Sequence, residues 1–92
     1  MIIGSLRIRL FVRDSRSLKD KRQVVKSIKD KLRQQFNVAV AEIEALEHRQ
    51  LVVLGFATVS NEAKHAQTVL QQVVDALRRH PVAEFVDHEM EV

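Results

Sequence analysis

A chain of 92 residues has room for a single compact domain, and we expect residues 1–92 to form one. Hydrophobic residues make up 46% of the chain and charged residues 29%, a balance that excludes an intrinsically disordered protein. The apolar runs are too short for a transmembrane helix, and the first residues lack the pattern of a secretory signal. Cysteine is absent, which excludes disulfides and thiol chemistry and favours a cytoplasmic protein.

The formal net charge of +3 conceals an uneven distribution of charge along the chain. Residues 1–36 contain eleven basic and three acidic groups, whereas residues 37–92 contain four basic and nine acidic groups. The first part therefore carries +8 and the second −5. A basic segment of this kind can attract an anionic partner, or it can pair with the acidic segment within one chain or between two.

The first half of the chain predicts a strand followed by a helix. Residues 2–12 alternate with a period of two, which is typical of a strand with one face in the core. A polar loop follows, and Ser17 with Asp20 then forms a start that resembles a capping box. Because apolar residues recur beyond this point with helical period, we expect a helix over residues 18–35.

The second half predicts two further strands and a second helix. Residues 37–45 form a strand, and residues 51–59, the most apolar stretch, form a central one. Ser60 or Asn61 is expected to cap the second helix, which ends before Pro81.

The end of the chain completes the predicted fold. Val86, His88 and Met90 share the parity that faces the core, and they alternate with acidic residues to form a last strand. The order β-α-β-β-α-β predicts an α+β, ferredoxin-like fold, a four-stranded antiparallel sheet with both helices on one face. The last strand then lies beside the first, and Arg7 and Arg9 can face its acidic residues.

The face of the sheet without helices is expected to be partly apolar. It still carries Ile3 and Phe11, and the second and third strands are apolar at both parities. A second copy of the chain is the simplest cover for such a face, so we expect a homodimer through it. The alternative is a monomer with a partly apolar face.

A row of cations is the strongest functional signal. Basic residues recur in the predicted first helix at i, i+3, i+7, i+10 and i+14, within about 80° of the helix circumference. The row consists of Lys19, Arg22, Lys26, Lys29 and Arg33. It predicts contacts with the phosphates of a nucleic acid, and the alternatives are a solvated helix face and contact with an acidic protein surface.

The loop before this helix is a second candidate site, for an anion. Arg13, Arg16 and the amides near Ser17 can form a pocket at the helix N-terminus. Acylphosphatase-type enzymes have this fold and use this loop, but their glycine-rich loop is absent, because Gly4 and Gly55 lie elsewhere.

No residue pattern predicts catalysis, a metal site or a cofactor. The four histidines are not spaced as metal ligands, and a nucleophile elbow is absent. Glu42 and Glu44 share a parity in their strand, which alone indicates little about acid–base chemistry. Phe11 and Phe56 are expected in the core or an interface and not as platforms for stacked bases.

Three segments resemble a known family. They are Ser17–Arg22 (S-L-K-D-K-R), Phe36–Glu42 (F-N-V-A-V-A-E) and Leu54–Asn61 (L-G-F-A-T-V-S-N). They are similar to the YlxP-like family, small bacterial domains of unknown function, and the resemblance spans essentially the whole chain. It implies a ferredoxin-like fold, the bacterial cytoplasm and no established catalytic residue. Family genes often neighbour genes for translation and ribosome maturation, which implies RNA or the ribosome as partner.

The chain departs from this family in one hairpin, where it has Arg49-Gln50-Leu51 in place of the usual Trp-Gln-Arg. With this departure in mind, we expect a non-enzymatic, dimeric binding domain that contacts structured RNA on the ribosome through the first helix, and neither a membrane nor a cofactor. The first alternative is a homo-oligomeric protein-interaction module that binds no nucleic acid. The second is an acylphosphatase-like enzyme with an anion site.

Overall fold

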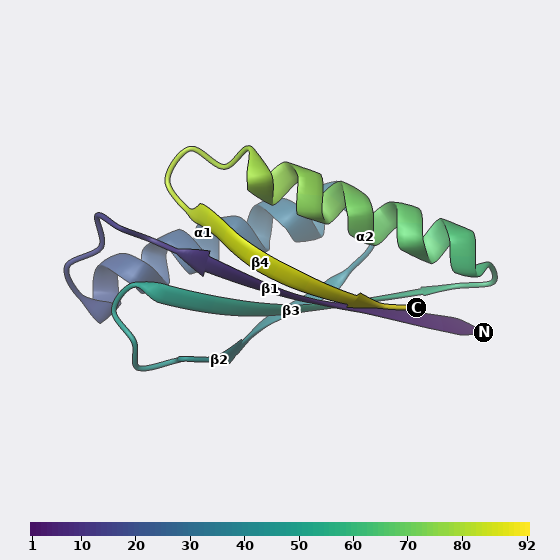
Figure 1. Ribbon diagram of the computed structural model, residues 1–92, viewed down its shortest axis with the longest axis horizontal. Coiled ribbons are helices and arrows are strands. Elements are labelled where there is room, and N and C mark those ends of the chain that lie inside the picture. The colour runs from purple at the N-terminus through teal and green to yellow at the C-terminus, as the bar shows by residue number, and fades with distance from the viewer.

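The computed structural model describes residues 1–92 as a four-stranded antiparallel sheet with two helices on one face (Figure 1). The elements are β1 (Ile2–Phe11), α1 (Leu18–Gln35), β2 (Ala39–Glu44), β3 (Leu51–Ser60), α2 (Ala63–Arg78) and β4 (Glu84–Glu91). The strands lie in the order β2-β3-β1-β4, which makes β2 and β4 the edge strands. This arrangement confirms the predicted α+β, ferredoxin-like fold. Neither helix combines the length and the apolar content needed to span a bilayer.

The core lies between the helices and one face of the sheet. Leu6, Ile8 and Leu10 alternate along β1 and are at most 2% exposed. They belong to one apolar cluster with residues of β2, β3 and both helices, chiefly Val25, Ile28 and Leu32 of α1 and Leu70, Val73, Val74 and Leu77 of α2, and Phe85 and Met90 of β4 pack against it. Because β1 pairs with both β3 and β4, the alternation in this single strand assigns one face of the sheet to the core.

Helix α1 begins as its capping pattern predicts. Ser17 Oγ accepts a hydrogen bond from the Asp20 backbone N–H at 3.1 Å, and Asp20 Oδ2 accepts one from the Arg16 N–H, also at 3.1 Å. This reciprocal pair satisfies amides that the first turn leaves without helical partners. The helix over residues 18–35 is confirmed at both ends.

The predicted cap of α2 is wrong. The N-cap is Glu62, whose side chain makes no capping hydrogen bond, and Ser60 Oγ instead accepts the Glu62 N–H at 3.1 Å. Ser60 is the last residue of β3 and pairs with Ile2 of β1. Since the strand continues through this residue, the helix begins only at Ala63.

A bulge in β2 separates two glutamates that the sequence places on one face. The register with β3 shifts between Glu42 and Glu44. Glu42 consequently reaches Lys21 on α1, whereas Glu44 reaches Arg7 on the open face. The expectation that the two glutamates share a face is therefore wrong, because an extra residue in a strand reverses the alternation beyond it.

A second bulge changes which residues of β4 meet the core. Leu10 pairs with Phe85 and Arg9 pairs with Asp87, so Val86 has no partner on β1. Phe85 packs against the core, and Val86 is 50% exposed. The expectation that Val86 faces the core is therefore wrong, for the same reason as in β2.

The most unusual core residue is Lys21, which is fully buried. Its Nζ donates hydrogen bonds to the carbonyl oxygens of Ala45 at 2.7 Å and Leu51 at 2.9 Å. The same Nζ forms an ion pair with Glu42 Oε2 at 2.9 Å. Lys21 thus ties α1 to the β2–β3 connection, and sequence reasoning counted it only as one more cation.

The Lys21–Glu42 pair is expected to matter for stability. We expect Lys21→Met to lower the free energy of unfolding by about 3 kcal/mol, because it leaves a largely buried carboxylate without its cation. The double variant Lys21→Met/Glu42→Gln should recover much of this loss in urea unfolding. Lys64→Met on the exposed side of α2 serves as the control. A loss no larger than in this control would contradict the assigned role.

Candidate nucleic-acid interface

The predicted row of cations lies on one outer face of α1, and we call these five residues the α1 ridge. Its members are Lys19, Arg22, Lys26, Lys29 and Arg33. They cover about 21 Å along the helix axis at 1.5 Å per residue. Lys29 is half-buried and the other four are exposed, so the row reaches solvent along its whole length.

One carboxylate interrupts the α1 ridge. Asp30 Oδ2 lies 2.9 Å from Lys26 Nζ, and Asp30 Oδ1 lies 3.4 Å from Arg33 Nη1. The hydrogen bond from Lys26 lowers the pKa of Asp30, and the charges of Arg33 and Lys29 act in the same direction. Asp30 therefore stays ionised and forms ion pairs with two of the five cations.

The other three ridge cations, Lys19, Arg22 and Lys29, make no ion pair with the protein's own carboxylates. They are therefore free to pair with an anion from solution. Five cations against one carboxylate leave the ridge strongly positive, which is the electrostatic property that a polyanion recognises.

A groove of about 380 Å³ runs between α1 and the edge strand β2. Four ridge residues line it (Arg22, Lys26, Lys29 and Arg33), together with Val25, Asp30 and Glu42. Arg33 Nη2 also lies 3.4 Å from the carbonyl oxygen of Val40, which places this end of the ridge against β2. The ridge is thus one wall of a concave surface.

The candidate anion site before α1 is largely engaged within the chain. Arg13 donates two hydrogen bonds to the Glu84 carboxylate, at 2.9 and 3.1 Å. Ser17 Oγ caps the helix, and the backbone N–H of Arg16 is bonded to Asp20. Only the guanidinium of Arg16 has no protein partner among these groups, so the loop presents one free cation to an anion.

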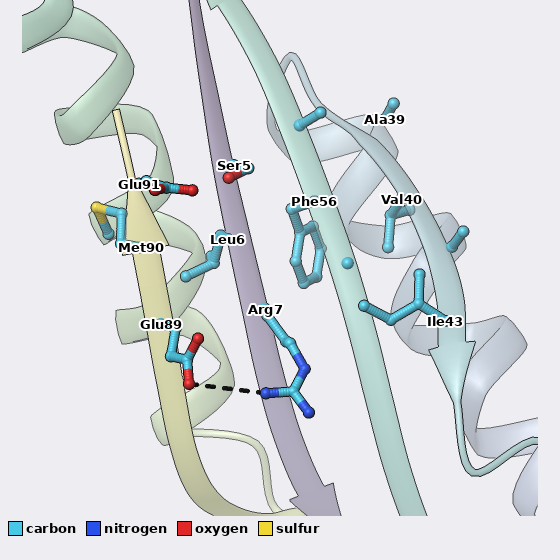
Figure 2. A pocket seen from close by; sticks show the side chains of 13 residues that line it. Ser5, Leu6, Arg7, Ala39, Val40, Ile43, Phe56, Glu89, Met90 and Glu91 are labelled. Atoms are coloured by element: carbon cyan, nitrogen blue, oxygen red, sulfur yellow. Dashed lines mark ion pairs between the residues drawn. The ribbon is translucent and has the colours of Figure 1, made fainter.

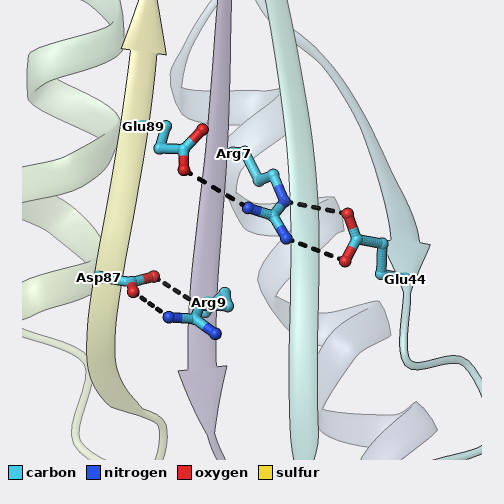
Figure 3. Close-up of polar contacts among 5 residues, drawn as sticks. All are labelled: Arg7, Arg9, Glu44, Asp87 and Glu89. Carbon is cyan, nitrogen blue, oxygen red and sulfur yellow. Dashed lines mark hydrogen bonds and ion pairs between the residues drawn. The ribbon is translucent and has the colours of Figure 1, made fainter.

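Two further arginines are held on the open face of the sheet (Figure 3). Arg9 makes a two-pronged contact with Asp87, and Arg7 lies 3.7 Å from Glu89, which confirms the expected pairing of β1 with the acidic side of β4. Arg7 also donates hydrogen bonds of 3.0 and 2.9 Å to Glu44. The arginine hydrogen bonds lower the pKa of both Glu44 and Asp87.

Sequence reasoning missed the Arg7–Glu44 pair. The two residues lie on strands separated by β3, and the Arg7 side chain spans that strand where it carries Gly55. Gly55 was no signal for this pair, because the Ile43 side chain fills the space above it. The bulge that turns Glu44 to this face has no local signature either.

Hydrogen bonds join the hairpin Arg49-Gln50-Leu51 to the loop between β1 and α1. Gln50 Nε2 donates to the carbonyl oxygens of Arg13 at 2.9 Å and Ser15 at 3.4 Å. Ser15 Oγ donates back to the Arg49 carbonyl at 2.7 Å. With Leu51 also bonded to the buried lysine, this hairpin is tied to the start of α1.

Two histidines act as hydrogen-bond acceptors in turns. His48 Nδ1 accepts the backbone N–H groups of Gln50 and Leu51, and His80 Nδ1 accepts those of Val82 and Ala83. Burial lowers the pKa of His80, and the charge of Lys31 lowers it further. The structure places no group of three or more His, Cys, Asp or Glu side chains where they could hold a metal ion.

His80 is expected to make the stability depend on pH. Because its folded pKa lies below the usual 6.5, the unfolded chain takes up a proton first as the pH falls. The contribution of His80 to the free energy of unfolding should therefore be fully present above about pH 6.5 and should decline as the pH falls below that value. We expect His80→Asn to flatten this part of the profile of Tm against pH, and His65→Asn, at an exposed position, to leave it unchanged. An undiminished decline in His80→Asn would contradict the assignment.

Comparisons with known proteins agree with the fold and the sequence pattern. A family model described as "Protein of unknown function (DUF503)" matches residues 3–90. The chain is 31% identical over 83 residues to a protein of Bacillus subtilis (strain 168) described as "Uncharacterized protein YlxP", and the match covers 90% of each chain. The earlier resemblance to YlxP-like proteins is confirmed, and the chain belongs to the DUF503 family of proteins of unknown function.

Proposed function

We propose that this protein is a non-enzymatic binding domain whose α1 ridge contacts the phosphates of a structured RNA. The observation that carries the proposal is a row of five cations along about 21 Å of one helix face, with a single carboxylate, Asp30, among them. A rigid helix holds these charges in a row at alternating steps of three and four residues, which suits the regularly spaced phosphates of a folded nucleic acid.

The surroundings of the ridge favour contacts with the backbone over contacts with bases. Phe56 is 2% exposed, and Phe36 and Phe85 pack against the core. Phe11 is half-buried and lies in β1, away from α1. Without aromatic side chains beside the cations, the ridge offers no platform for unstacked bases. We therefore propose recognition of RNA shape with little sequence preference.

The ribosome is the structured RNA that we propose to test first. Gene neighbourhoods in the YlxP-like family, as implied by the resemblance, point to translation and ribosome maturation. Purified bacterial ribosomal subunits and a fragment of ribosomal RNA are suitable probes, and a pull-down from bacterial lysate with and without nuclease separates RNA from protein partners.

The free cations of the ridge supply the first test. We expect Lys19→Gln/Arg22→Gln/Lys29→Gln to weaken binding to a ribosomal RNA fragment about 10–100-fold near 0.1 M salt, because three phosphate contacts are lost. The slope of log affinity against log salt should fall by about 2–3. Fluorescence anisotropy over a range of salt concentrations measures both quantities.

A matched control carries the same charge change on the other helix. Lys64→Gln/Arg78→Gln/Arg79→Gln removes three cations from α2 and the residue that follows it. We expect little change in affinity or salt slope. Equal effects in the two triple variants would show that net charge alone drives binding and would refute a role for the α1 ridge.

Asp30 supplies a test with the opposite sign. Asp30→Asn frees Lys26 and Arg33 from their shared carboxylate, so we expect RNA affinity to rise about 3–10-fold and the salt slope to steepen by up to about 2. Glu62→Gln, which removes an unpaired exposed carboxylate at the N-cap of α2, is the control. Unchanged affinity in Asp30→Asn would mean that phosphates do not meet these two cations.

A further inference from the structure

The open face of the sheet contains a trough (Figure 2). Its floor consists of short side chains on the three strands beside one another, β2, β3 and β1. These residues are Ser5, Ala39, Ala41, Gly55 and Ala57. The hollow has a volume of about 870 Å³ and is open to solvent. Arg7 and Ile43 bound one side of it, and Glu89 and Glu91 line the end at β4.

Beside the trough stands an apolar ridge made of Ile3 and Val59. The two residues pair across β1 and β3, one step beyond the pair of Ser5 and Ala57 on the same face. Their exposed fractions are 59% and 54%, although both are large aliphatic residues within a sheet. The open face therefore has two neighbouring rows of opposite shape, one raised and apolar and the other hollow and lined by small side chains.

The charged groups of this face lie mostly on the other side of the trough and are already paired. Arg7 is engaged by Glu44, and Arg9 by Asp87. Within the trough and the apolar ridge, only Glu91 at the β4 rim lacks an ion-pair partner, because Glu89 lies 3.7 Å from Arg7. A cover over the apolar rows therefore buries no unpaired charge at its centre.

We propose that a second copy of this chain covers this part of the open face. A two-fold axis that runs across the strands, between the row of Ile3 and Val59 and the row of Ser5 and Ala57, places the apolar ridge of each copy over the trough of the other. A two-fold interface requires one patch to be complementary to itself, and two neighbouring rows of opposite shape meet this requirement. The β4 acids of each copy then lie at the rim, in contact with water.

The available area indicates a dimer that dissociates on dilution. At about 3.3 Å per residue and about 4.8 Å between strands, the open face of one copy measures about 540 Å². The proposed axis crosses β1 between Ile3 and Ser5, near one end of the strand, so the two sheets overlap only in part. They bury well under the about 1,100 Å² that full overlap of two such faces gives, an area in the range of weak, transient contacts. Because both helices lie on the opposite face of the sheet, each α1 ridge stays on the outside of the dimer.

The oligomeric state tests the proposal, by sedimentation equilibrium from about 10 μM to about 1 mM. We expect the mass-average molar mass to rise with concentration from 10.6 kDa toward twice that value. Ile3→Glu places a charge on the apolar ridge, and Ala57→Leu fills the trough at an exposed position. Each should shift the monomer–dimer midpoint at least about tenfold to higher concentration, since both remove contacts at the centre of the interface.

Val82→Glu is the matched control, because Val82 is 49% exposed but lies in the connection before β4. It should leave the midpoint unchanged, and circular dichroism confirms that each variant is folded. A constant mass of 10.6 kDa up to 1 mM would overturn the proposal, as would equal shifts in Ile3→Glu, Ala57→Leu and Val82→Glu. This result is independent of RNA binding, which the α1 ridge variants test separately.

Discussion

The strict alternation of β1 is the constraint on which the rest of this structure depends. One face of the strand carries Leu6, Ile8 and Leu10 into the core, and the other carries Arg7 and Arg9. Because β1 lies between β3 and β4, the two arginines stand near the middle of a sheet face that no helix covers. They are satisfied by carboxylates from both edge strands, and this arrangement determines which cations remain for a partner.

Fewer cations of the basic segment, residues 1–36, are therefore available to a partner than its composition indicates. Four of its cations are engaged away from the α1 ridge, namely Arg7, Arg9, Arg13 and Lys21. The three surface arginines are paired with acids of β2 and β4, so a large part of the charge asymmetry along the sequence is neutralised by the fold. What remains concentrated is the ridge of α1, where a single aspartate opposes five cations. The proposed function rests on this concentration and not on the net charge.

The two faces of the molecule offer different chemistry. The helix side presents cations at regular spacing next to a groove, and the sheet side presents apolar and small side chains with paired charges. Charge on the first face favours a hydrated polyanion, whose contacts weaken with salt. Shape and apolar area on the second favour a protein surface, and the proposed second copy would leave the helix side accessible.

Local patterns in the sequence were sufficient to predict an element wherever its apolar residues kept one period without interruption. The helix over residues 18–35 follows from its capping pair and its apolar spacing, and the pairing of Arg7 and Arg9 with β4 follows from the topology. The bulges in β2 and β4 were not predictable, because each is defined by the register with a neighbouring strand. They decided the faces of Glu44 and Val86, and the first of them allowed the Arg7–Glu44 pair to form.

The amino-acid sequence by itself determined the order of the elements, the core face of β1 and the positions of the five cations on one side of α1, because these depend on the geometry of single helices and strands. Only the tertiary structure decided that Lys21 is buried against two loop carbonyls, that Asp30 engages two ridge cations and that Ile3 and Val59 stand beside a trough. The physical reason is that burial, ion pairing and surface shape arise from the packing of several elements together, and a period within one element carries no information about what lies opposite it.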